Sequence, residues 1–173
     1  LVPRGLKNAV LFASSLLFYA WGEPRFCLFM LLSILQGYVF GRLIEKNAEN
    51  RKWSKIFLTA SVLLSLGLLG YCKYADFFIS SVNAVTGLSL KLLRVALPIG
   101  ISFYTFQILS YVVDVYRGDV PAQKSFLKLG TYIAMFPQLI AGPIVRYAEI
   151  APQLDERETT LEDVSSGAGR FVI

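Results

Sequence analysis

Polar side chains recur along an apolar segment that follows Pro98. When this segment is placed on a helix at about 100° per residue, one side gathers small and polar residues within a sector of about 80°. These residues are Gly100, Tyr104, Gln107, Tyr111 and Asp114. An aspartate at the centre of a bilayer costs about 2.5–3.5 kcal/mol or more. If the helix lies in a membrane, we therefore expect this polar face to point toward the protein interior or a water-filled cavity.

Two interpretations of the polar face remain open at this point. In the first, the face lines a channel through which a substrate reaches its site of reaction. In the second, the side chains bond to neighbouring helices and Asp114 pairs with Arg117, which follows it by one turn. Interhelical hydrogen bonds are common in membrane bundles, so the second interpretation needs no ligand.

Two prolines and a glycine interrupt the apolar run over residues 136–147. Pro137, Gly142 and Pro143 disfavour a continuous helix. Irregular backbone at membrane depth is tolerated only where protein or a water-filled cavity surrounds it. Arg146 follows directly, placed either to hold an anionic group or to anchor in the lipid headgroups. Gly142, Pro143 and Arg146 are therefore further candidates for a channel-lining or structural role.

The sequence contains no histidine. It therefore has no serine–histidine pair, no histidine base and no histidine metal site. A glycine-rich phosphate loop of the usual spacing is also missing. The carboxylates between Asp155 and Asp163 lie in a polar stretch that we expect at the surface. We predict that the chain holds no catalytic residue, no metal and no bound cofactor.

The composition is that of a membrane protein. Hydrophobic residues make up 55% of the 173 residues and mean hydropathy is +0.55. Charged residues make up 17%, against a usual share of about a quarter. The basic residues behind the net charge of +5 mostly flank apolar runs. Such placement suits contact with lipid headgroups, and we expect the bilayer rather than nucleic acid as partner.

Five apolar segments predict an all-α, polytopic bundle of transmembrane helices, some of them short, broken or re-entrant. They cover residues 8–21, 26–43, 56–78, 92–116 and 126–140. The first is shorter than the roughly 20 residues that a bilayer requires. Gly37 and Gly41 have a spacing that suits close helix packing. The basic stretch 42–55 is predicted to be a cytoplasmic loop, and residues 83–90 a second loop.

Three blocks of this sequence resemble one family. They are SLLFYAW at 15–21, LPIGISFYTFQ at 97–107 with SY at 110–111 and DVYR at 114–117, and FP at 136–137 with GPIVRY at 142–147. Together they resemble the membrane-bound O-acyltransferases, in particular the alginate O-acetyltransferase-like branch. The resemblance extends over about residues 8–173 and its blocks stand in the same order.

The resemblance implies that residues 1–173 are the N-terminal part of a single membrane-embedded acyltransferase domain, truncated before the half that carries the family's essential histidine. The whole enzyme would be a multi-pass protein of the cell inner (cytoplasmic) membrane. It would transfer an acyl group, expected to be acetyl, to hydroxyls of an extracytoplasmic polysaccharide. Acyl-CoA or a carrier-linked acyl group would be the donor, and extracytoplasmic acyl-transfer proteins would be partners.

The resemblance assigns no catalytic role within this chain, which is predicted to be inactive alone. Its matching positions carry only a structural or channel-lining role, and they are Tyr104, Gln107, Asp114, Arg117, Gly142, Pro143 and Arg146. Two other functions stay open. One is a fragment of a helical transporter or channel, in which broken helices and polar faces are equally natural. The other is a non-catalytic membrane assembly subunit.

Overall fold

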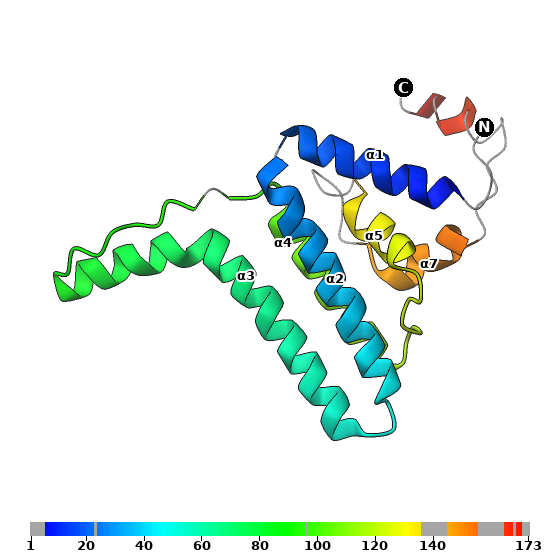
Figure 1. Ribbon diagram of the computed structural model, residues 1–173, viewed down its shortest axis with the longest axis horizontal. Helices are drawn as coiled ribbons and strands as arrows, with labels where there is room; N and C mark the ends of the chain where they lie inside the picture. The colour runs from blue at the N-terminus through cyan, green and yellow to red at the C-terminus, as the bar shows by residue number, and fades with distance from the viewer. Residues whose placement is uncertain are drawn as a thin grey trace.

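The computed structural model describes residues 6–22, 24–95, 97–135, 145–155, 165–167 and 169–170. Its labelled helices are α1 (Lys7–Gly22), α2 (Pro24–Lys46), α3 (Arg51–Thr86), α4 (Ile101–Arg117), α5 (Phe126–Ala134) and α7 (Tyr147–Asp155) (Figure 1). This described part of the chain contains no β-strand. The predicted all-α class is confirmed.

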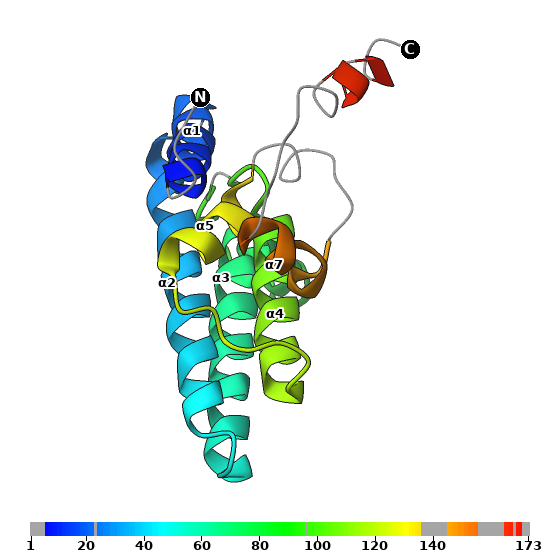
Figure 2. The same cartoon turned by 90° about the vertical axis from the view of Figure 1, so that its right-hand side faces the viewer.

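Helices α2, α3 and α4 pack together as an elongated bundle, seen from two sides in Figures 1 and 2. Two glycines let α2 approach α4 closely. A Cβ atom on Gly37 would lie 2.9 Å from Cγ2 of Ile108, and one on Gly41 would lie 2.8 Å from the hydroxyl oxygen of Tyr111. Neither position has room for a side chain, so the close packing expected from the glycine spacing is confirmed.

Helices α2 and α3 are long and apolar enough to cross a bilayer. They contain the predicted segments 26–43 and 56–78. Large apolar side chains on both helices are exposed, with Leu28 61% and Leu63 66% accessible. Such a surface is stable when lipid covers it, because apolar side chains in contact with lipid carry no free-energy penalty of exposure to water. The described helices are therefore those of an all-α membrane protein.

Several predicted boundaries were wrong. Helix α2 continues to Lys46 and α3 begins at Arg51, so the predicted loop over 42–55 shrinks to a four-residue turn. The helices extend beyond their apolar runs into charged residues, because a helix is stable in water as well as in lipid. Helix α3 also continues through Thr86 into the predicted loop 83–90.

The C-terminal part of α3 forms an arm with residues 87–95. In Figure 1 the helix bends away from the bundle and the extended segment returns beside it. Gly87 ends the helix with a φ of 70°, a conformation that favours glycine. Asn83 then donates to the carbonyl oxygen of Leu90 and accepts from its N–H, both at 2.9 Å, and Asp76 accepts from the N–H of Leu93 at 2.7 Å. These bonds hold the returning segment to the helix.

Helices α1, α5 and α7 pack at one end of the bundle (Figures 1 and 2). Gly130 of α5 leaves space for the ring of Phe12 in α1, where an added Cβ would lie 2.7 Å from Cε2. Asn8 of α1 accepts from the Thr131 hydroxyl at 3.1 Å and donates to the carbonyl oxygen of Leu154 in α7 at 2.9 Å. The described helix α5 ends at Ala134, short of the predicted span 126–140, whose residues 136–140 lie outside the described ones.

Candidate functional site

Helix α4 ends close to the predicted boundary, but it begins nine residues later than predicted. Pro98 precedes it, Gly100 has a φ of 74°, and the N–H of Ile101 donates to the Pro98 carbonyl at 3.3 Å. Gly118 closes it with a φ of 81° and donates to the carbonyl oxygen of Val115 at 3.1 Å. Both glycines take left-handed conformations that other residues adopt only under strain. The predicted segment 92–116 is therefore helical only from Ile101 onward.

The polar face of α4 points into the protein, as predicted. Tyr104, Gln107, Tyr111 and Asp114 are 0%, 2%, 0% and 4% exposed. Helix α4 contacts α2, α3, α5 and α7. A carboxylate and three further polar side chains are thereby removed from lipid, which satisfies the energetic requirement on a membrane helix.

Around Tyr111 the polar face is tightly packed. The Tyr111 hydroxyl accepts from the N–H of Gln123 at 2.9 Å. Its ring meets that of Tyr147 edge to face at 5.1 Å, and Tyr147 meets Tyr132 in the same way at 5.3 Å. The Gln123 amide also donates to the Tyr147 hydroxyl. We call Tyr111, Tyr132, Tyr147 and Gln123 the tyrosine cluster. At this point the face makes contacts between elements, as the second interpretation expects.

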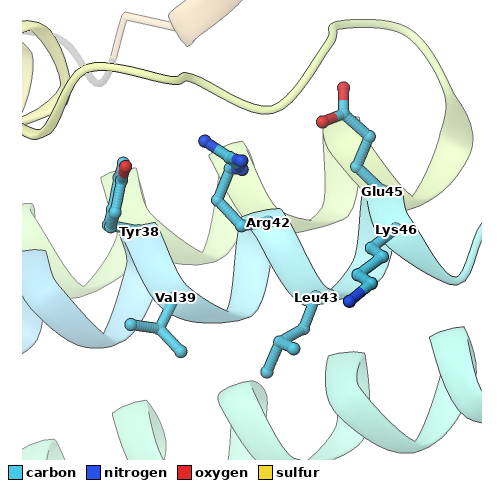
Figure 3. A pocket seen from close by; sticks show the side chains of 6 residues that line it. All are labelled: Tyr38, Val39, Arg42, Leu43, Glu45 and Lys46. Atoms are coloured by element: carbon cyan, nitrogen blue, oxygen red, sulfur yellow. The ribbon is translucent and has the colours of Figure 1, made fainter.

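Helix α2 holds the segment that carries Gln123. Glu45 accepts from the N–H of Ala122 at 2.9 Å, and the Tyr38 hydroxyl donates to the carbonyl oxygen of Lys124 at 3.0 Å. Figure 3 shows Tyr38, Arg42 and Glu45 on the side of α2 that faces this segment. These residues also line a pocket of about 430 Å³ on the outer surface of α2. The pocket therefore lies beside the contacts that hold residues 122–124, and no residue of the tyrosine cluster lines it.

Two oxygens of the polar face differ from the Tyr111 hydroxyl. The hydroxyl oxygen of Tyr104 and Oδ2 of Asp114 are buried and have no hydrogen-bond partner among the described residues. Asp114 lies within electrostatic range of the Tyr132 hydroxyl, which donates to the carbonyl oxygen of Val145 at 2.7 Å. A buried polar atom without a partner costs about 1–3 kcal/mol. These two oxygens are therefore candidate positions for a further hydrogen-bond partner.

The remaining sequence candidates lie elsewhere. Arg117 is exposed and, within the described part of the chain, forms no ion pair with Asp114, so the expected pairing is absent. Arg146 is also exposed, just before α7. Gly142 and Pro143 lie outside the described residues. The structure therefore brings together four of the candidates, and those four share α4.

Three residues of the cluster were not predicted as site residues. Gln123, Tyr132 and Tyr147 come from three elements that follow α4 in the sequence. Their partners on α4 are 12 or more positions away, so no helical spacing could connect them. The one local signal was the paired glycines of α2, which indicate that a bulky side chain lies opposite.

The chain is similar to curated acetyltransferases over nearly all its length. The "Probable alginate O-acetylase AlgI" of Pseudomonas syringae is 39% identical over 96% of this chain and 33% of its own length. The protein of the same name from Pseudomonas aeruginosa is 36% identical over 96% of this chain and 33% of its own. The chain is thus similar to the proteins named alginate O-acetylases along nearly its whole length. The "Peptidoglycan O-acetyltransferase" of Helicobacter pylori is 28% identical over 83% of this chain and 32% of its own length.

These relatives confirm the resemblance to membrane-bound O-acyltransferases that the blocks at 15–21, 97–117 and 136–147 indicated. The chain spans about a third of the length of the curated relatives it matches. No family model matches the chain. No solved structure shows a significant match to it.

Proposed function

We propose that this chain is the N-terminal membrane part of an O-acyltransferase that moves an acetyl group to hydroxyls of an extracytoplasmic polysaccharide. The observation that carries the proposal is the similarity to alginate O-acetylases along 96% of the chain. The relatives' names share O-acetyl transfer and differ in the polymer, alginate or peptidoglycan. The names therefore support acetyl as the transferred group more strongly than they support any one polymer as the acceptor.

The transfer itself defines what the rest of the enzyme must supply. A hydroxyl oxygen of the acceptor attacks the acyl carbonyl carbon, a new ester bond forms, and the bond to the donor breaks. The hydroxyl proton must pass to a base, most often a histidine in enzymes. The 173 residues contain no histidine. In this proposal the base comes from a part of the enzyme outside this chain, and acyl-CoA or a carrier-linked acyl group is the donor.

The polar face of α4 would serve as a positioning surface. Oδ2 of Asp114 is a buried carboxylate oxygen without a partner among the described residues. It can therefore accept a hydrogen bond from the polysaccharide hydroxyl that is to be acetylated, or from a protein group that holds this hydroxyl. A correctly held hydroxyl reacts faster because its orientation is already fixed. Packing around Tyr111 would keep this part of the face rigid.

Acyl transfer can be tested directly on the complete enzyme and on this chain. Purified membrane protein would be incubated with acetyl-CoA and with de-acetylated alginate or peptidoglycan, and polymer-bound ester would be measured. We expect transfer by the complete enzyme and none by the 173 residues above a control without protein. Transfer by the chain alone would contradict the assignment of the base to another part. Lack of transfer by the complete enzyme to either polymer would contradict the acceptor class.

Asp114→Asn in the complete enzyme tests the positioning role. Asparagine keeps the size of the side chain and removes the charge. We expect turnover per folded molecule to fall well over tenfold, which is more than about 1.4 kcal/mol of transition-state stabilisation. Asp119→Asn is the matched control, because Asp119 is exposed and lies five positions later. It should stay within about twofold of the wild type.

The two interpretations of the polar face give different kinetics. A positioning role lowers kcat or raises KM at unchanged membrane abundance and melting temperature. A purely structural role lowers abundance or melting temperature and leaves turnover per folded molecule normal. The second pattern would remove Asp114 from the proposed site.

A further inference from the structure

A pocket of about 380 Å³ lies where the turn between α2 and α3 meets the C-terminal end of α4. Figures 1 and 2 both show the start of α3 and the end of α4 at the same end of the bundle. The pocket is lined by the end of α2, the first turn of α3 and residues 115–118. It is separate from the tyrosine cluster, whose residues do not line it.

Two arginines face this pocket and no carboxylate lines it. Arg51 comes from α3 and Arg117 from α4. Within the described part of the chain neither guanidinium forms an ion pair. The nearest acidic residues in sequence, Glu49 and Asp119, are exposed and do not line the pocket. Both arginines are exposed. Two positive charges beside an open volume suit an anion, because guanidinium groups bind phosphate and carboxylate oxygens through paired N–H donors.

The first turn of α3 adds further donors. The first N–H groups of a helix have no partner within it, and they carry the positive end of the helix dipole. Asn50 at the N-cap forms no side-chain cap. Ser54 lines the pocket, is only 3% exposed, and its hydroxyl has no hydrogen-bond partner among the described residues. A hydroxyl at the wall of the pocket can donate to a ligand with acceptor oxygens.

We propose that this pocket binds a phosphate group at the membrane surface. Arg51 and Arg117 would neutralise its charge, and the Ser54 hydroxyl and the α3 N-terminus would donate to its oxygens, an arrangement that helix N-termini provide for phosphate. The phosphate can belong to a soluble nucleotide-type ligand or to a lipid headgroup, since basic pockets between membrane helices bind headgroups as well. With coenzyme A as the ligand the proposal rests on the proposed function, because it places the phosphates of the donor; with a lipid headgroup it is independent of acyl transfer.

Two binding measurements on the purified full chain separate the sources. In the first, coenzyme A is titrated by calorimetry into protein in a phospholipid-free detergent. In the second, protein is mixed with phosphatidic acid or phosphatidylcholine, and retained lipid is counted by native mass spectrometry. Saturable binding of coenzyme A supports a soluble ligand. Preferential retention of phosphatidic acid supports a headgroup, and either result supports the phosphate site.

Variants tie the binding to this pocket. Arg51→Gln and Arg117→Gln should each weaken it about tenfold, and Ser54→Ala about threefold. Lys55→Gln is the control, because it removes one positive charge from the same end of α3 without lining the pocket. It should change affinity by less than about twofold. Helical circular dichroism must match the wild type for each variant compared.

Two results would overturn the proposal. One is that folded wild-type protein binds neither coenzyme A nor phosphatidic acid in a saturable way. The other is that Lys55→Gln weakens binding as much as Arg117→Gln does, since the effect would then reflect overall charge. Because the readout is binding, failure of acyl transfer in the complete enzyme would leave this site unaffected.

Discussion

Replacing Gly41 by alanine should destabilise the bundle through one defined clash. The new Cβ would lie 2.8 Å from the Tyr111 hydroxyl oxygen and 2.9 Å from its Cε1, against the 3.4–4 Å of ordinary contact. Tyr111 cannot yield easily, because it is fully buried, its hydroxyl accepts from Gln123 and its ring packs on Tyr147. Overpacking of this kind costs about 1–3 kcal/mol.

Gly67→Ala is the matched control for this prediction. Gly67 lies in α3 and an added Cβ there would meet nothing within 4 Å. Both substitutions gain the same helix propensity, about 1 kcal/mol for glycine to alanine, so their difference isolates the clash. We expect the Gly41 variant to be less stable than the Gly67 variant by about 2 kcal/mol, or about 4–8 °C in melting temperature for a chain of this size.

The assay is thermal unfolding of both purified variants in the same mild detergent, followed by near-ultraviolet circular dichroism. Adding Tyr111→Phe to the Gly41→Ala protein removes the nearest atom of the clash and should recover part of the loss. Such recovery is a coupling energy between contacting residues. Equal melting temperatures for the two alanine variants would refute the close approach of α2 and α4 at this position.

Three further predictions concern orientation, the membrane core and the arm. Lys46→Cys in intact cells should resist an impermeant thiol reagent, since basic helix ends stay in the cytoplasm; ready labelling from outside would reverse the topology. Gln36→Leu should lower the free energy of unfolding by about 0.5–2 kcal/mol, because the Gln36 amide bonds to two serines of α3; unchanged thermal unfolding would show that this network adds no stability. Asn83→Ala should release the segment around Leu90 and speed its proteolysis, and an unchanged cleavage rate would contradict the holding role of these bonds.

Local signals in the sequence predicted the buried face of helix α4 and nearly its C-terminal end, but not its start at Ile101. Pro98 restricts the backbone before the helix, Gly100 and Gly118 permit the left-handed conformations at its two ends, and the spacing of polar residues defines the buried face. Both effects act within a few residues, so one sequence is enough to detect them. The same reasoning placed Gly37 and Gly41 at a close contact, although it could not name Ile108 or Tyr111 as their partners.

Helix boundaries were predicted less well because hydropathy marks where lipid ends rather than where a helix ends. The charged residues over 42–46 and 51–55 are helical, and so are residues 83–86. Thr86 even stays helical with its hydroxyl bonded to the carbonyl oxygen of Val82 at 2.6 Å. A backbone that leaves the membrane keeps its helical hydrogen bonds until a residue such as Gly87 ends them.

The polar face of α4 illustrates what one sequence cannot decide. Sequence left a substrate channel and interhelical contact as alternatives, and the structure shows interhelical contact around Tyr111. Tyr111 has its partner and is enclosed by aromatic rings, whereas Tyr104 and Asp114 each keep a buried oxygen without one among the described residues. The two lie ten positions apart, about 15 Å along the helix. Each such oxygen costs about 1–3 kcal/mol when it has no partner, and turnover of the Asp114→Asn enzyme tests whether a bound group offsets that cost at Asp114.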